Sequence, residues 1–188
     1  MVLANGGSPL AKVLAEKLLV RRVIILDSAV TDKVAQEVIA KMLFLQSRSR
    51  KEPITLAINS LGGCVSSGMA IVDTIRELDS PVHTCCMAYA YAMAAIILAS
   101  GIRGERSAVR NAKIAFRGSE SGSELESGRS ELDRERIDRV LIQRTSEVTQ
   151  ISPIEVRDLF VSGKALSAVQ SLELGIIDRV VEQCVPDS

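Results

Sequence analysis

The hydrophobic positions of this 188-residue chain alternate between short continuous runs and longer periodic stretches. Continuous apolar runs bounded by charged or turn residues are typical of strands buried in a parallel sheet. Apolar residues that recur every three or four positions indicate helices with one buried face. Strands are therefore predicted at 22–26, 54–58, 82–87, 107–109, 113–116 and 176–181. Helices are predicted at 9–19, 31–46, 64–78, from the end of the third strand to Ser100, and at 130–148, 153–160 and 167–175.

Residues with a preference for helix ends support several of these boundaries. Thr31 or Asp32 can cap the second helix, Pro153 suits a first helical turn, and Ser167 and Gly175 suit the two ends of the last helix. Strands that alternate with helices imply right-handed crossovers and a mostly parallel sheet, which is the α/β class. We expect an N-terminal segment at 1–21 and one domain at 22–188, without internal repeats.

The alternation breaks after Phe116. Residues 118–128 are polar and are predicted to form a flexible loop, and the helix predicted at 130–148 is heavily charged with only a thin apolar stripe. A helix of this kind is not expected in a core, so we expect it to stand in solvent or to pair with another chain. The region from about 118 to 150 is thus predicted to protrude from the domain.

Composition excludes several classes of function. A formal net charge of zero and an aromatic content of 3% without Trp argue against nucleic acid and anionic membranes as partners. The uncharged run 85–99 is too short to span a bilayer, which needs about 20 apolar residues. We expect no cofactor and no metal, because the four cysteines have no zinc-site spacing: Cys64, Cys85, Cys86 and Cys184. We expect these to be reduced, inert thiols, and the protein to be cytoplasmic or in an organelle matrix, since the N-terminus lacks signal-peptide features.

The stretch 82–101 is the most informative part of the chain, because a buried strand runs directly into an apolar helix. Many α/β hydrolases place a nucleophile at such a sharp strand-to-helix turn. Here the turn reads Tyr91-Ala92-Met93-Ala94, which contains no Ser, Cys or Thr. The sequence predicts the architecture of an active site without its reactive atom.

Three groups of motifs together give the chain a resemblance to a known family. The first is Met42-Leu-Phe-Leu45 with Ile58-Asn-Ser-Leu-Gly-Gly63, the second is Ala92-Met-Ala-Ala-Ile-Ile-Leu-Ala-Ser-Gly101, and the third is Leu166-Ser-Ala168 with Glu173-Leu-Gly-Ile-Ile-Asp178. From about Leu18 to Val181 the chain resembles the ClpP family, the proteolytic subunits of the Clp protease. The resemblance implies a crotonase-like α/β fold of βα repeats with a protruding handle helix, a Ser-His-Asp triad, and two stacked heptameric rings.

Carried over position by position, the resemblance places the three triad residues on substituted positions. The nucleophilic Ser falls on Ala92, the His on Arg117 and the Asp on Gly163. A methyl group cannot attack a carbonyl, a guanidinium does not act as a base, and glycine has no side chain to orient one. The chain is therefore most similar to the non-catalytic, ClpR-type subunits, which imply an active ClpP paralogue as partner in a mixed ring and an AAA+ Clp unfoldase as partner of the assembled complex.

Two further features of the family carry over in altered form. Gly62 and Gly63 match the glycines of the oxyanion hole, although they could equally serve only to let the turn enter the next helix. Thr55 and Ala57 match aromatic positions that accept a hydrophobic loop of the unfoldase. Because these two side chains offer little apolar area, we expect weak or absent docking on faces built from this chain alone. In the handle, a charged helix favours an unlike partner across the ring-to-ring interface.

Two alternatives stay open at the level of sequence. One is an active peptidase with an unconventional nucleophile drawn from Cys64, Ser66, Ser67 or Ser100, with His83, the only histidine, as its base. A Cys64–His83 dyad is the sharpest form of that hypothesis. The other is a crotonase-like acyl-CoA binder, which would use the same Gly62-Gly63 turn and apolar helix.

Overall fold

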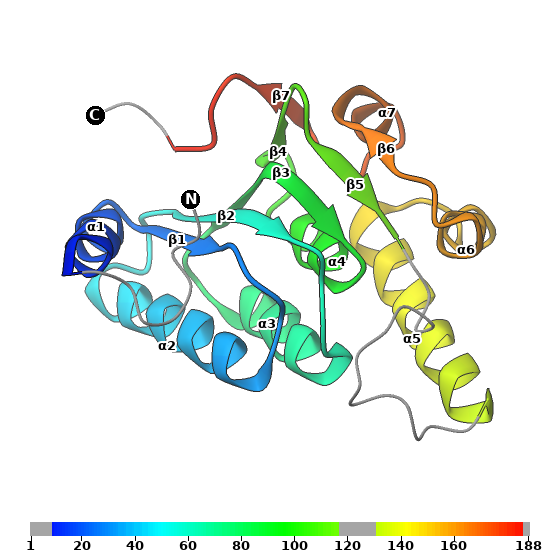
Figure 1. The fold of residues 1–188 in the computed structure, drawn as a ribbon, viewed down its shortest axis with the longest axis horizontal. Coiled ribbons are helices and arrows are strands. Elements are labelled where there is room, and N and C mark those ends of the chain that lie inside the picture. Colours follow the sequence, from blue (N-terminus) through cyan, green and yellow to red (C-terminus); the bar gives the residue numbers. More distant parts are fainter. Residues whose placement is uncertain (1–8, 117–130, 186–188) are drawn as a thin grey trace.

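The computed structural model describes residues 9–116 and 131–185, and within them a seven-stranded sheet forms the centre of the molecule (Figure 1). Five strands pair in parallel in the order β1 (Val23–Leu26), β2 (Ile54–Ser60), β3 (Val82–Tyr91), β4 (Arg106–Val109) and β7 (Arg179–Val181). Strand β5 (Lys113–Ala115) pairs with the second half of β3, and β6 (Leu166–Ser167) runs antiparallel to β5. The mostly parallel sheet predicted from the sequence is confirmed.

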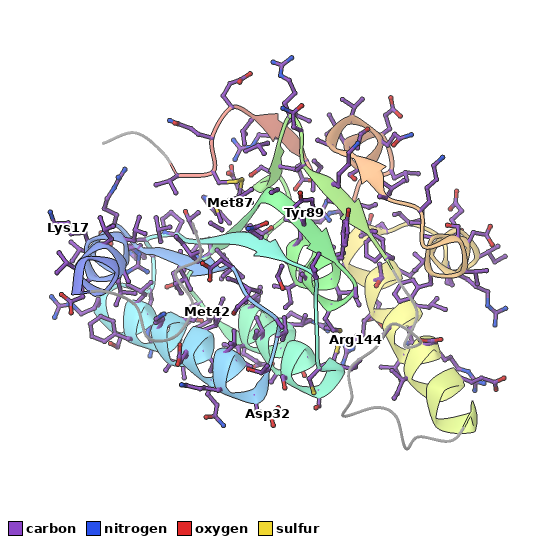
Figure 2. All side chains as sticks on the ribbon, viewed as in Figure 1. Lys17, Asp32, Met42, Met87, Tyr89 and Arg144 are labelled. Atoms are coloured by element: carbon purple, nitrogen blue, oxygen red, sulfur yellow. A yellow bond between two sulfur atoms is a disulfide. The ribbon has the colours of Figure 1, made fainter. Side chains whose placement is uncertain are left out.

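Helices α2 (Asp32–Arg48), α3 (Val65–Glu77) and α4 (Met93–Ala99) cover one face of the sheet (Figure 1). Their apolar sides meet alternate strand residues in a continuous core that includes Met42, Leu56 and Cys86. Helix α1 (Pro9–Val20) lies against β1 at the edge of the sheet. Figure 2 shows Met42 on the covered side, whereas Met87 and Tyr89 project from the other side. Among residues 9–116 and 131–185, no helix has both the length and the apolar character needed to cross a lipid bilayer.

The predicted helix caps are confirmed. The Thr31 hydroxyl accepts a hydrogen bond from the Val34 N–H at the start of α2. Pro153 occupies the first turn of α6 (Pro153–Ser162), and Ser167 forms a reciprocal capping box with Gln170 at the start of α7 (Ala168–Glu173). Gly175 follows α7 in a left-handed conformation with φ +72°. These local signals depend on residues only a few positions apart, which is why the sequence predicts them well.

Two strand boundaries differ from the prediction by three or more residues, and strand β6 was not predicted. Strand β3 continues to Tyr91 instead of ending at Met87, because Tyr89, Ala90 and Tyr91 pair with β5. The final strand begins at Arg179 rather than Ile176. The N–H groups of Ile176 and Ile177 both donate to the Ser171 carbonyl, so these two residues form the turn that ends α7 and bury their side chains there.

The prediction that the charged helix α5 (Glu131–Thr149) is excluded from the core is wrong for its second half. Its second half packs against α4 and α6, and Leu141, Thr145 and Thr149 are buried. One thin apolar stripe is enough to pack this half of the helix, because only one side of it is covered by other elements. The first half extends away from the sheet (Figure 1). Residues 117–130 of the predicted handle region lie outside the described residues.

The prediction of four free thiols is wrong for two of them. Cys85 in β3 forms a disulfide with Cys184, which follows β7, while Cys64 and Cys86 are free. The two bonded cysteines are 99 positions apart, and the fold brings their Cα atoms to 5.4 Å. The expected cytoplasmic or organelle-matrix location relied partly on reduced cysteines, so it loses that support.

A buried ion pair fastens the end of α7 to the centre of the sheet. The Arg106 side chain is 1% exposed and donates two hydrogen bonds to Asp178, from Nε to Oδ2 at 2.8 Å and from an Nη to Oδ1 at 2.7 Å. Asp178 also accepts hydrogen bonds from the backbone N–H groups of Gly104 and Arg106. Burial alone would raise the pKa of Asp178, but the hydrogen bonds from Arg106 and Gly104 and the Arg106 charge outweigh burial and lower it.

Replacing Asp178 by Asn is expected to lower the free energy of unfolding by about 3 kcal/mol, because a buried guanidinium would lose its counter-charge. The wild-type contribution is present above the unfolded aspartate pKa of about 3.9 and is lost as the pH falls through the lower folded value. Urea denaturation at pH 7 and at pH 3 measures both effects. Glu182→Gln, which removes the exposed Arg110–Glu182 pair, is the matched control and should change little. Equal losses in the two variants would contradict the prediction.

Candidate functional site

The turn between β3 and α4 has the strained geometry expected of a nucleophile-bearing elbow. Ala92 adopts φ +48° and ψ −122°, a backbone conformation that residues with a side chain rarely adopt. Its N–H donates to the Ala115 carbonyl at 2.9 Å, and its own carbonyl accepts from the Ala95 N–H at 3.0 Å. The strand pairing and the first turn of α4 thus keep Ala92 in this strained conformation, which costs about 1–3 kcal/mol.

The glycine pair after β2 packs directly against this elbow. A Cβ atom at Gly62 would lie 2.7 Å from the Tyr91 carbonyl oxygen and 2.9 Å from the Ala92 Cβ. A Cβ atom at Gly63 would lie 2.4 Å from the Val30 carbonyl oxygen. Both glycines also have positive φ angles, +93° and +150°. Three backbone segments therefore meet at distances that only glycine allows.

The hydrogen bonds of this turn bear on the expected oxyanion hole. The Gly62 N–H donates to Ser60 Oγ at 3.1 Å, and Ser60 Oγ donates to the Ser28 carbonyl at 2.6 Å. The Gly62 N–H is therefore engaged inside the turn, which favours the alternative that Gly62 serves backbone packing. Ser60 is a structural residue that the sequence reasoning missed. Its place directly before Leu61-Gly62-Gly63 was the available signal, since serine hydroxyls often organise tight turns.

The structure brings the neighbourhoods of the three expected triad positions to the end of β5. Ala92 is hydrogen-bonded to Ala115, and the Phe116 ring packs on the Phe160 ring of α6 with centroids 5.7 Å apart. Gly163 is the C-cap of α6, three residues after Phe160, in a left-handed conformation with φ +54°. Arg117 follows Phe116 but lies outside the described residues. Ala92 and α6 thus both contact the end of β5, at Ala115 and at Phe116.

His83 is far from every candidate nucleophile at the turn. It pairs with Thr55 near the start of β2, and its Nδ1 lies 3.7 Å from a carboxylate oxygen of Glu105. Cys64 follows the opposite end of β2. The five residue-to-residue steps from Thr55 to Ser60 alone span roughly 16 Å along the strand, so His83 is out of hydrogen-bond reach of Cys64. The structure does not form the Cys64–His83 dyad.

The remaining nucleophile candidates have structural partners. Ser100 donates to the Ile96 carbonyl within α4, and Ser67 donates to Asp32 at the start of α2. The Cys64 Sγ lies 3.1 Å from Ser66 Oγ. Partial burial would raise the pKa of Cys64, but hydrogen bonds from Ser66 and Ser67 outweigh burial and lower it. Cys64 is therefore the most reactive free thiol among the described residues, but no histidine stands beside it.

Thr55 and Ala57, the expected docking positions, lie on the sheet face opposite α2, α3 and α4. Thr55 is half-buried and Ala57 is fully buried. Ala57 sits beside Cys85 of the disulfide in the β2–β3 register. These positions therefore offer little apolar surface in the described structure.

Comparison with protein families decides the relationship. A family model described as Clp protease matches residues 6–184. The chain belongs to the Clp protease family. The match spans the whole sheet together with the elbow and the glycine turn, and the βα repeats with their parallel-rich sheet are those of the ClpP α/β fold.

In this Clp family fold, the contact between Gly62 and the elbow can be tested by adding one methyl group. Gly62→Ala is expected to lower the free energy of unfolding by about 3 kcal/mol, from strain at positive φ and from overlap with Tyr91 and Ala92. Gly104→Ala is the matched control, because Gly104 has nearly the same φ, +89°, with no atom within 4 Å of the added Cβ. It should cost only about 1 kcal/mol in urea denaturation. A control as destabilised as Gly62→Ala would show that backbone strain, not packing, is decisive.

The strain at Ala92 predicts an unusual response to glycine. Ala92→Gly is expected to leave stability unchanged or to raise it by about 1 kcal/mol, because glycine adopts positive φ without strain. Ala94→Gly, two residues later inside α4, should lower stability by at least about 1 kcal/mol. Thermal and urea unfolding of the two variants measure the difference. Similar losses in both would mean that Ala92 is not strained in solution.

Proposed function

We propose that this chain is a non-catalytic, ClpR-type subunit of a mixed Clp protease ring, in which an active ClpP paralogue supplies the serine sites. The observation that carries the proposal is the elbow at Ala92. Its backbone has the geometry that presents a nucleophile, and its side chain is a methyl group. A methyl group offers no electron pair for attack on a peptide carbonyl.

The lack of a suitable general base near the elbow supports the same proposal. His83 is the only histidine in the sequence, and it lies at the opposite end of β2 from the elbow turn. Arg117, at the position matched to the family's histidine, stays protonated at physiological pH and so does not accept a proton from a nucleophile. Gly163 ends α6 with backbone alone. A mechanism of the family's kind would thus need three side chains that this chain lacks.

The preserved backbone is consistent with a structural role in the ring. The elbow and the glycine turn shape the wall where family members hold substrate, and this chain keeps both without the reactive group. Among the described residues of α5, the charged side chains of Glu135, Arg139 and Glu147 are exposed, which would favour an unlike partner through complementary charges. Unfoldase docking would fall mainly to neighbouring subunits, since Thr55 and Ala57 supply no aromatic ring.

The proposal predicts that the purified chain neither cleaves peptides nor reacts with a fluorophosphonate. Co-expressed with an active ClpP paralogue, it should enter a ring whose mass by native mass spectrometry includes both subunits. In that ring, fluorophosphonate should label only the paralogue. Pairing the chain with a Ser→Ala form of the paralogue should abolish peptidase activity, while the mixed ring still forms.

Peptidase activity of the chain by itself would contradict the proposal. Cys64→Ser then serves as the deciding variant, because Cys64 is the thiol with the lowered pKa beside the turn. Activity that disappears in Cys64→Ser would establish a cysteine peptidase instead. Activity that survives this change and still reacts with fluorophosphonate would point to one of the serines.

A further inference from the structure

The Cys85–Cys184 disulfide joins the middle of the sheet to the last described residues of the chain. Cys85 lies in β3, which pairs with β2, β4 and β5. Cys184 lies in the segment 182–185, which we call the C-terminal strap. Figure 1 shows the strap leaving β7 and running back over the side of the sheet opposite α2 and α3. The disulfide therefore fixes the strap on a face that the helices leave uncovered.

Little else holds the strap in place. The pairing between β4 and β7 ends at Val181. Residues 183–185 form no backbone hydrogen bond with any residue that the structure describes. Within 9–116 and 131–185, the ion pair of the strap joins Glu182 to Arg110, and the two side chains are 83% and 74% exposed. Exposed ion pairs contribute little to stability. Apart from the partial burial of Val185, the position of the strap thus depends on the disulfide.

The two sulfur atoms differ in their access to a reductant. Cys85 is 2% exposed, whereas Cys184 is partly exposed. A thiolate from solvent therefore reaches the bond from the Cys184 side. Neither free thiol is placed to exchange with it: Cys86 belongs to the core on the other face of β3, and burial raises its pKa to about 12. Cys64 follows the far end of β2.

The face beneath the strap contains a buried pair of small residues. Ala57 and Cys85 are side by side in the β2–β3 register and are 0% and 2% exposed. Further along the same strand, Tyr89 is 48% exposed. This face is therefore covered at Cys85, where the strap is attached, and open at Tyr89.

We propose that the Cys85–Cys184 disulfide is a redox-sensitive latch, which holds the strap over the β2–β3 face when oxidised and releases it when a dithiol reductant cleaves the bond. One thiolate of the reductant attacks the Cys184 sulfur, forms a mixed disulfide and expels the Cys85 thiolate, which takes up a proton. The second thiol of the reductant then attacks the mixed disulfide and frees Cys184 as a thiol. Two electrons pass to the protein, and the reductant becomes an intramolecular disulfide.

Release changes the surface of the sheet without rearranging the core. Cys85 becomes accessible, while the helices on the other face keep their contacts with the strands. The latch goes beyond the proposed function and does not depend on it, because it concerns the C-terminal strap and not the elbow.

Two measurements on the full chain, both read by mass spectrometry, test the latch. The first is the rate at which a glutamyl endopeptidase cleaves after Glu182 in the strap, and the second is hydrogen–deuterium exchange of the helices. The protein is first equilibrated with oxidised glutathione and then compared with and without dithiothreitol. Reduction should speed cleavage after Glu182 at least tenfold and leave hydrogen–deuterium exchange in α2, α3 and α4 unchanged. Iodoacetamide under native conditions should label only Cys64 before reduction, and Cys64, Cys184 and Cys85 afterwards.

Two variants separate the latch from other effects of the reductant. Cys184→Ser should be cleaved quickly after Glu182 with or without dithiothreitol, whereas Cys64→Ser should respond as the wild type does. Slow cleavage after Glu182 in the reduced protein would overturn the proposal, since the strap would then be held without the bond. Faster exchange throughout α2–α4 would also overturn it, because the disulfide would then stabilise the whole fold. If Cys184→Ser does not fold, the reduced wild-type protein decides between these outcomes.

Discussion

The close backbone contact between Gly62 and the elbow at Tyr91 and Ala92 is the constraint on which the rest of the site depends. A Cβ at Gly62 would overlap both residues, and a Cβ at Gly63 would overlap Val30. The turns that follow β1, β2 and β3 therefore fit together only as bare backbone. This contact fixes where α3 and α4 begin, and with them the apolar layer under the sheet.

The contact also explains how a strained elbow survives without a reactive side chain. The conformation of Ala92 is determined by the pairing of β3 with β5, by the first turn of α4 and by the Gly62 backbone. None of these interactions involves the atom that a nucleophile would add. Loss of the nucleophile therefore leaves the elbow in place, and the geometry of a family active site can persist in a chain that is proposed to serve only as a ring subunit.

A second set of interactions joins the C-terminal part of the chain to the same sheet. Asp178 accepts hydrogen bonds from the buried Arg106 side chain and from two backbone N–H groups, and Cys184 is covalently attached to Cys85. The first link is the ion pair between Asp178, which follows α7, and Arg106 of β4. The second link is the disulfide on the sheet face that the helices leave uncovered, and it depends on redox conditions. The segment after α7, residues 174–185 (Figure 1), is thus held at two places with different chemistry.

The sequence by itself determined the features that depend on neighbouring residues. Apolar runs and caps such as Thr31, Pro153 and Ser167 predicted the order of the elements, and the motifs around Gly62 and Ala92 predicted the family that the comparison shows. The absence of Ser, Cys and Thr from the elbow was equally plain in the sequence. Each of these signals is local, because caps and turns are built from residues a few positions apart.

Only the tertiary structure decided which distant residues meet. Cys85 looked like one of four free thiols until the fold placed it beside Cys184, 99 positions away. Strand β3 extends to Tyr91 because its last residues pair with β5. The second half of α5 is partly buried because its thin apolar stripe packs against α4 and α6. Likewise, the sequence allowed a Cys64–His83 dyad, but in the fold His83 lies near the start of β2 and Cys64 follows the end of β2. Contacts of this kind follow from chain topology, which no short stretch of residues encodes.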